Sequence, residues 1–281
     1  MGRVALPELR RYGYDGGFST ATLAAGGTLG ILIPPSVVLV IYAILTEQNI
    51  AKLFLAAVLP GVIAAVGYVI AISIYVRLNP TSAGVREAIP MAQRFRQLGA
   101  VWPVLLVFVA VVGGIYGGIF TPTEGAAVGA LGTGLIALVN GGLTGRTLIE
   151  SFMVTAKSSA MIFFIVLGAA IYNGFLALTQ VPQEMSAWVV DQGFAPVTVL
   201  IVILIFYLLL GCVMDSLSMI LLTIPIFFPV IMVLDFGMTP EQVAIWFGIL
   251  TLIVVEVGLI TPPVGMNLFV IKLILHRTFS R

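Results

Sequence analysis

The chain has 281 residues, of which 60% are hydrophobic and 9% charged, and its net charge is +1. Soluble domains carry about 25% charged residues, and no single soluble core of this length could bury so much apolar sequence. The composition therefore indicates an integral membrane protein, gives no sign of nucleic-acid binding, and offers neither a disulfide framework nor a metal cluster, since Cys212 and His276 are each the only residue of their kind.

Apolar segments of about 20 residues, the length that crosses a bilayer, recur along the chain. In order they are 19–46, 53–76, 99–119, 125–140, 158–178, 196–214, 217–234 and 243–275. The first and last are interrupted by glycine and proline. Segment 179–196, with Trp188 beside polar residues, is predicted to be an interfacial helix. The predicted fold class is an all-α polytopic membrane protein.

The basic residues concentrate in two connecting loops. Loop 77–97 holds Arg77, Arg86, Arg94 and Arg96, and loop 141–157 holds Arg146 and Lys157. Because basic loops face the cytoplasm, these two are predicted to be cytoplasmic, and loops 46–52 and 179–196 external. The crossings between the loops agree with all four assignments. No G-x-x-x-x-G-K-[ST] motif occurs, which excludes ATP hydrolysis by that route.

Two apolar segments carry the same interruption. "GILIPPSVVLVIY" (30–42) and "GLITPPVGMNLFV" (258–270) both read glycine, three residues, Pro-Pro and then apolar residues. Such paired, broken segments in the two halves of a chain point to the binding site of a secondary transporter.

Each break predicts a cation site beside an anion site. Proline has no N–H, so the carbonyls of residues 30–31 and 258–259 lose their helical partners, and a bound Na⁺ would satisfy them. The next helix should begin near Ser36 or Val264 and offer free N–H groups to a carboxylate. Thr28, Thr261 and Asn267 add polar side chains. The predicted sodium-binding residues are Gly30, Ile31, Pro34, Asp215, Gly258, Leu259, Thr261 and Pro262.

Three carboxylates lie in or near apolar spans, where acids are functional candidates. Glu124, in "TPTE", either completes a capping box with Thr121 or contacts substrate. Asp215 either caps the following helix or forms an ion or substrate site with Ser216 at the tip of a re-entrant hairpin. Glu256 either faces the cavity at the second break or pairs with a polar neighbour.

Five stretches carry a family resemblance: "GYDGGFSTATLAAGGTLGILIPPS", "LTEQNIAKLFLAAVLPG", "GGIYGGIFTPTEGAAVGA", "GCVMDSLSMILLTIPIFFPV" and "EVGLITPPVGMNLFVIK". They closely resemble the large membrane subunit, DctM type, of TRAP transporters, in order over about residues 12–272. The resemblance implies an elevator-type secondary transporter built from two inverted repeats, each with a re-entrant hairpin and a broken helix.

The resemblance also implies a function. Such subunits import organic acids, commonly C4-dicarboxylates or sialic acid, by Na⁺ symport across the bacterial inner membrane. A small membrane subunit and a periplasmic substrate-binding protein complete the system. No other cofactor is implied, and no enzymatic activity.

Within one membrane domain, residues 12–98 would be the end of the first repeat with a connector, and 99–275 the second repeat. Breaks 30–36 and 258–263 would form the two sodium sites, the second facing the hairpin of Asp215. The expected substrate-binding residues are Ser36, Glu124, Thr179, Ser216 and Asn267. Thr179 lies where some relatives have a substrate-binding arginine, which makes sialic acid the less expected substrate.

Other interpretations remain open at this point. Because a first hairpin would precede Gly13 and a last helix would follow Lys272 in the family, the chain is expected to be a fragment. A stand-alone Na⁺- or H⁺-coupled carboxylate transporter of similar architecture is an alternative to the TRAP subunit. An intramembrane enzyme using Asp215 and Glu124 is a second, less favoured alternative.

Overall fold

The computed structural model describes residues 2–84, 90–91 and 99–271, and all regular elements in these ranges are helical. The all-α prediction is therefore confirmed for them. Three arginines of the predicted cytoplasmic loop 77–97 lie outside the described residues, namely Arg86, Arg94 and Arg96. Lys272 and His276 also lie outside them. The elements are α1 (Gly2–Arg11), α2 (Gly16–Leu32), α3 (Val37–Thr46), α4 (Ile50–Leu78), η1 (Pro80–Ser82), η2 (Gly99–Val101), α6 (Trp102–Tyr116), α7 (Pro122–Val139), α8 (Gly145–Thr179), α9 (Val181–Asp191), α10 (Pro196–Gly211), α11 (Ser216–Met232) and α12 (Pro240–Ile260).

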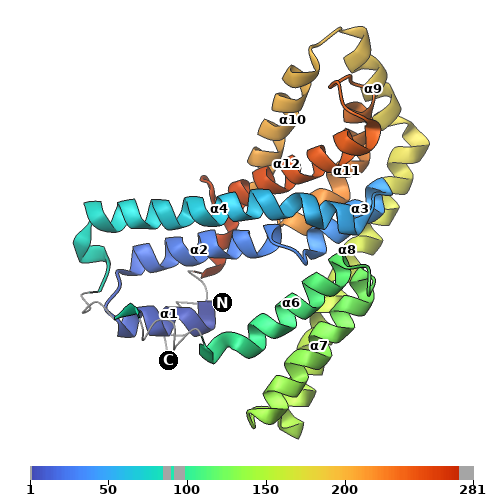
Figure 1. Cartoon of the computed structure of the whole chain (residues 1–281). Helices are drawn as coiled ribbons and strands as arrows, with labels where there is room; N and C mark the ends of the chain where they lie inside the picture. Colours follow the sequence, from blue (N-terminus) through green and yellow to red (C-terminus); the bar gives the residue numbers. More distant parts are fainter. Residues whose placement is uncertain (1, 85–89, 92–98, 272–281) are drawn as a thin grey trace. The chain divides into compact units, whose positions relative to one another are not determined.

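The chain forms two compact units, one of Met1–Val85 with Ala169–Arg281 and the other of Arg86–Gly168. These boundaries differ from the expected repeats at 12–98 and 99–275, which stay a prediction. In the second unit α6 lies along α7 (Figure 1). Gly125 and Gly132 of α7 face the side chains of Ile115 and Val107 of α6, so small residues allow the close helix approach that membrane proteins use.

The first unit is built around α12. Of the most apolar 18 residues of α12, 61% are buried, against 22% in α4. Helix α12 is therefore an inner helix and α4 a peripheral one. The helices α10, α11, α2, α3 and α4 all contact it (Figure 1). Tyr42 of α3 donates a hydrogen bond to the Ala244 carbonyl at 2.6 Å, and its ring occupies the space that a side chain at Gly248 would fill.

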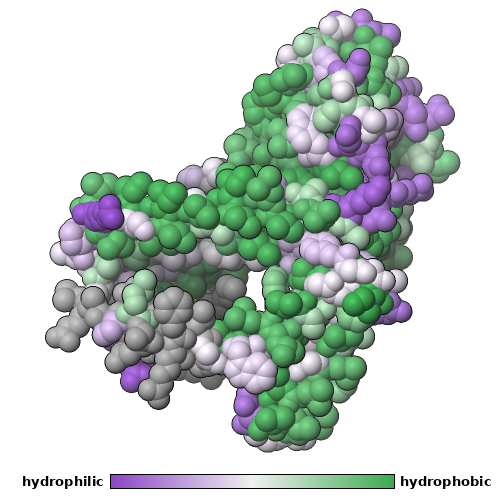
Figure 2. All heavy atoms as spheres, viewed as in Figure 1, coloured by the Kyte–Doolittle hydropathy of each residue, from purple (hydrophilic) through white to green (hydrophobic). Residues whose placement is uncertain are grey.

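The outer surface is strongly apolar. Figure 2 shows hydrophobic residues covering α4 and α10, whose exposed side chains include Leu59, Ile63, Val202 and Leu209. Soluble monomers rarely expose such continuous apolar area, whereas lipid covers it in a membrane. Among the described residues, α4, α7, α8 and α12 are long and apolar enough to cross a bilayer, and the bent pair α2–α3 passes as one further span.

The structure agrees with the sequence prediction for segment 179–196 and differs from it for loop 141–157. Segment 179–196 does form a separate short helix, α9, as predicted. The predicted loop 141–157, in contrast, is mostly helical, because α8 already begins at Gly145. Thr144 and Thr147 bond across its first turn, and Arg146 pairs with Glu150 one turn later at 3.0 Å. These local contacts extend α8 beyond the apolar run that hydropathy identified.

Candidate functional site

The first predicted break is present. Helix α2 ends at Leu32, α3 begins at Val37, and the two axes meet at a bend of 41°. The Ile33 N–H donates to the Leu29 carbonyl at 3.0 Å and completes the last turn of α2. The Pro34–Pro35 peptide bond between the helices is cis. Residues 30–36 therefore interrupt the span at the expected place.

Ser36 is the N-cap of α3, as the prediction of a helix start near Ser36 requires. Its Oγ accepts the Leu39 N–H at 3.4 Å, and the side chain is buried. A hydroxyl that accepts one bond can still donate its own proton, so capping leaves Ser36 able to bind a ligand oxygen. Its role as a substrate ligand stays a prediction.

Two carbonyls ahead of the first break have no hydrogen-bond partner among the described residues. In the described ranges, no hydrogen bond reaches the carbonyl oxygen of Gly30 or Ile31. The reason is the one inferred from the sequence, since the residues four positions later, Pro34 and Pro35, have no N–H to donate. Two acceptors at one helix end are thus left for an external partner.

The second break follows α12. The helix ends at Ile260, the Pro262–Pro263 bond is cis, and helical structure resumes at residue 266. This start lies two residues after Val264, near which it was expected. Gly265 has φ of +60°, a left-handed conformation that a right-handed helix excludes, and so the helix begins only after it.

One of the carbonyls predicted to be free at this break is bonded. The Thr261 N–H donates to the Gly258 carbonyl at 3.0 Å, so the prediction for Gly258 is wrong. The last turn of α12 tightens to an i to i+3 bond, a common way to satisfy a helix end. The Leu259 carbonyl, four residues before Pro263, has no hydrogen bond from any residue that the structure describes.

The turn between α10 and α11 contacts the second break, as the family resemblance implied for the hairpin of Asp215. The Cys212 thiol lies 3.4 Å from the Pro262 carbonyl oxygen and 3.3 Å from the Leu208 carbonyl oxygen, and its single proton is donated to one or the other. A Cβ placed on Gly258 would lie 2.8 Å from the Gly211 Cα, so the two helix backbones touch with no side chain between them. The polar tip at 212–216 therefore covers the carboxyl end of α12.

Asp215 caps α11. Its carboxylate accepts the Ser218 N–H at 3.0 Å and the Ser218 hydroxyl at 2.6 Å, and the residue is exposed. The capping interpretation is thus confirmed. Each carboxylate oxygen can accept more than one bond, so an exposed Asp215 can also coordinate a cation, and that role stays a prediction.

Glu256 is the acid that the sequence analysis left out of its ligand sets. It is only 4% exposed, and in the described part of the chain neither carboxylate oxygen has a hydrogen-bond partner. The Ser216 side chain, at the start of α11, lies near the carboxyl group. Its position two residues before Gly258, on the most buried long helix, was the signal available in the sequence.

The remaining candidates are dispersed. Glu124 forms the predicted capping box with Thr121 at the start of α7, which belongs to the other unit. The Thr179 hydroxyl donates to carbonyls one turn earlier in α8, and Thr261 donates likewise to Val257 at 2.6 Å. Asn267 is half-buried in the helical residues after the second break. The sodium role of Thr261 and the substrate roles of Glu124, Thr179 and Asn267 stay predictions.

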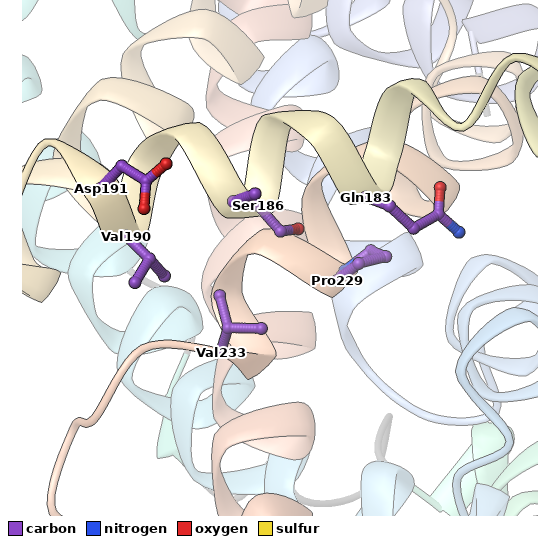
Figure 3. Close-up of a pocket in the computed structure, with 7 residues that line it drawn as sticks. Gln183, Ser186, Val190, Asp191, Pro229 and Val233 are labelled. Atoms are coloured by element: carbon purple, nitrogen blue, oxygen red, sulfur yellow. The ribbon is translucent and has the colours of Figure 1, made fainter.

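A separate pocket of about 530 Å³ lies between α9 and α11. Figure 3 shows Gln183, Ser186 and Asp191 of α9 beside Pro229 of α11 and Val233, which follows the end of α11. The Ser186 hydroxyl is already bonded to the Pro182 carbonyl at 2.8 Å, and no basic residue lines the pocket. An acidic residue without a basic one disfavours an organic anion, so this pocket is unsuited to a carboxylate.

Comparison with known proteins places these features in a family. The profile described as "Tripartite ATP-independent periplasmic transporter, DctM component" matches residues 1–281. The chain is 38% identical over 275 residues to the C4-dicarboxylate TRAP transporter large permease protein of Pseudomonas aeruginosa, covering 96% of this chain and 62% of that protein. It therefore spans about 62% of that relative's length.

Two further relatives carry other substrate names. The chain is 30% identical over 273 residues to the sialic acid TRAP transporter large permease protein of Vibrio cholerae, covering 97% of this chain and 62% of that one. It is 32% identical over 275 residues to the isethionate TRAP transporter permease protein of Oleidesulfovibrio alaskensis, covering 96% and 42%. The profile match and these relatives together show that the chain belongs to the DctM family of large TRAP transporter permeases, multi-pass proteins of the bacterial inner membrane.

Proposed function

We propose that this chain is the permease part of a Na⁺-coupled importer of organic acids, acting with a small membrane subunit and a periplasmic substrate-binding protein. The observation that carries the proposal is the pair of Pro-Pro breaks in one compact unit, where no described residue donates a hydrogen bond to the carbonyls of Gly30, Ile31 and Leu259. Bare carbonyls in a membrane interior cost several kcal/mol each, of order 2–7, and a bound alkali cation offsets that cost.

The two breaks would hold cations in different ways. At the first, the carbonyls of Gly30 and Ile31 supply neutral oxygen ligands. At the second, the Leu259 carbonyl acts with the oxygens of Thr261 and the exposed carboxylate of Asp215, whose turn contacts that break. Hard cations such as Na⁺ prefer oxygen ligands of this kind.

The substrate carboxylates would bind beside the cations. Helices α3 and α11, whose N-caps are Ser36 and Asp215, begin next to the two breaks, and their first N–H groups carry partial positive charge. Bound Na⁺ adds positive charge and offsets the negative charge of Asp215. Binding of the organic anion therefore depends on Na⁺. This dependence couples the two fluxes in an elevator-type cycle.

A C4-dicarboxylate is the substrate class we favour. Relatives at 38% and 34% identity are named C4-dicarboxylate permeases, against 30% for the sialic acid permease. Thr179 also offers no positive charge to a sialic acid carboxylate. The ectoine and isethionate relatives show that the substrate must still be tested directly.

The test is uptake of radiolabelled succinate by the complete transporter in proteoliposomes, with and without Na⁺ and its binding protein. We expect uptake only when both are present. Uptake without a binding protein would support the stand-alone transporter instead. Uptake that is equal in Na⁺ and K⁺ media would overturn the coupling proposal.

A further inference from the structure

A groove of about 510 Å³ lies between α2 and α4, two helices of the first compact unit that run side by side (Figure 1). It is open to the outside, because Ala21, Val69 and Tyr75, which line it, are exposed. None of the described residues that line it is charged, and none belongs to the proposed Na⁺ and substrate sites. The groove therefore has no use in the function proposed above.

The hydroxyl groups inside the groove are already bonded within the chain. Thr22 donates to the Phe18 carbonyl at 2.8 Å, and the hydroxyls of Tyr68 and Thr28 pair at 3.0 Å. The other walls are glycine, alanine and larger apolar side chains. Such a groove offers favourable contacts to hydrocarbon but little to replace the hydration of a polar organic acid. Its lining thus selects an apolar chain.

The length of the groove matches one leaflet of a bilayer. Because the two helices are antiparallel, Gly17 and Tyr75 lie at one end of the groove, and Leu29 and Ala65 at the other. The groove spans 12 residues of α2 and 10 of α4, which correspond to about 18 Å and about 15 Å along the helix axes. The hydrocarbon of one leaflet is about 15 Å deep, half of the bilayer core.

Aromatic rings mark the end of the groove at Tyr75, which we call its mouth. The ring of Phe18 stacks on Tyr75 with centroids 5.3 Å apart, and Tyr14 stacks on Phe18 at 6.2 Å. Tyrosine is enriched at the level of the lipid headgroups. The chain after α4 enters loop 77–97, which its arginines predict to be cytoplasmic. The mouth is therefore expected at the headgroups of the cytoplasmic leaflet.

The mouth also has a positive charge that the protein does not compensate. Arg77 lies in the last turn of α4, about 3 Å along the axis beyond the last residue that lines the groove, and is exposed. Within the part of the chain that the structure describes, no acid pairs with it. Asp15 caps α2 by accepting the Phe18 N–H at 2.9 Å, and Glu8 pairs with Arg11 at 3.8 Å. A phosphate group complements the charge of Arg77.

We propose that this groove binds an anionic phospholipid of the cytoplasmic leaflet, such as phosphatidylglycerol. One acyl chain lies between α2 and α4 from the mouth to the middle of the membrane, and the phosphate lies at Arg77. The acyl chain contributes apolar burial, and the unpaired positive charge favours a headgroup of net negative charge over a zwitterionic one. The proposal rests on the membrane location of the chain and is independent of Na⁺ coupling.

The experiment measures lipid binding by the complete purified transporter. Native mass spectra recorded during titration with phosphatidylglycerol or phosphatidylethanolamine give the apparent Kd of the first lipid bound. We expect phosphatidylglycerol to bind about fivefold more tightly, the effect of one basic residue at a membrane surface. Arg77→Gln should abolish this preference, whereas the control Arg146→Gln, an exposed arginine of α8, should retain it.

A second pair of variants tests the groove itself. Gly26 and Gly67 are helical glycines at which an added Cβ meets no described atom within 4 Å, but only Gly26 lines the groove. Gly26→Leu fills the groove and should weaken phosphatidylglycerol binding roughly tenfold, the effect of losing about two buried CH₂ groups. Gly67→Leu adds the same side chain elsewhere on α4 and should leave the affinity unchanged.

The outcomes distinguish this occupant from others. Equal affinity for the two lipids, an unaltered preference in Arg77→Gln, or unaltered binding in Gly26→Leu would each overturn the proposal. If Gly26→Leu does not assemble, cryo-electron microscopy of the unmodified transporter in phosphatidylglycerol nanodiscs decides. Acyl-chain density between α2 and α4 with a phosphate at Arg77 supports the proposal, whereas a protein helix in the groove, or a groove without lipid density, overturns it. No result here depends on uptake, so the proposed function is tested separately.

Discussion

Gly258→Ala tests the backbone contact between α10 and α12. The new Cβ would lie 2.8 Å from the Gly211 Cα and 2.9 Å from the Leu208 carbonyl oxygen. Both are backbone atoms, so no side chain can rotate out of the way. Ordinary van der Waals contact begins at 3.4 Å, whereas the new Cβ would lie 2.8 Å from the Gly211 Cα. The helices must therefore separate by about 0.6 Å.

That separation has two measurable consequences. Overpacking of this kind costs about 1–3 kcal/mol, which should lower the Tm of the purified protein by several degrees. The Cys212–Pro262 contact, 3.4 Å long, would lengthen and weaken, and the turn would shift from its position over the second break. We therefore expect Na⁺-driven uptake to fall at least tenfold.

The matched control is Gly174→Ala on α8, where an added Cβ meets no atom of the described residues within 4 Å. This variant should be neutral or stabilising by up to about 1 kcal/mol, because alanine favours the helix over glycine. A Gly258→Ala protein with unchanged Tm and unchanged uptake would refute the close crossing and its role in positioning the turn.

Three other substitutions separate local structural roles from binding roles. Asp215→Asn keeps an N-cap side chain but removes the negative charge, so the Na⁺ concentration for half-maximal uptake should rise at least tenfold with little change of Tm; an unaltered Na⁺ dependence would contradict the ligand role. Tyr42→Phe removes the bond to the Ala244 carbonyl and should lower stability by about 0.5–1.5 kcal/mol without altering Na⁺ dependence, as thermal denaturation and uptake assays would show. Glu124→Gln retains a capping-box side chain and should leave uptake intact, whereas a tenfold rise in the succinate KM would indicate a substrate contact.

The sequence was sufficient to predict the broken helices because proline acts locally. The missing N–H groups of Pro34, Pro35 and Pro263 determine which carbonyls lose partners, whatever surrounds them. The exception, Gly258, shows the limit of that reasoning. Thr261 has an N–H, and the choice between the carbonyls of Val257 and Gly258 depends on how the last turn closes.

The inner position of Glu256 was harder to predict. Its burial depends on helices far away in the sequence, and α12 is apolar along almost its whole length, so periodicity does not show which face turns inward. Asp215 and Glu256 are equivalent as acids beside apolar segments, yet one is an exposed cap and the other is buried. Only tertiary packing distinguishes them.

Thr261 offers the sharpest test of the second break, because its side chain replaces a lost backbone bond. In a regular helix the Thr261 N–H would donate to the Val257 carbonyl, but here it donates to Gly258 instead. The Thr261 hydroxyl then satisfies Val257 at 2.6 Å. Its oxygen thereby keeps lone pairs that can face a cation, with the O–H direction fixed by the helix.

Thr261→Val and Thr261→Ser should therefore differ sharply in the Na⁺ concentration that gives half-maximal uptake. Valine preserves the shape but removes the ligand oxygen and leaves the Val257 carbonyl unpartnered, so the Na⁺ concentration for half-maximal uptake should rise tenfold or more, equivalent to about 1.4 kcal/mol of lost binding. Serine keeps the hydroxyl and should stay within a few-fold of the unmodified protein. Equal Na⁺ dependence in both variants would mean that the hydroxyl only completes the helix end, and the cation at this break would then rely on Leu259 and Asp215 alone.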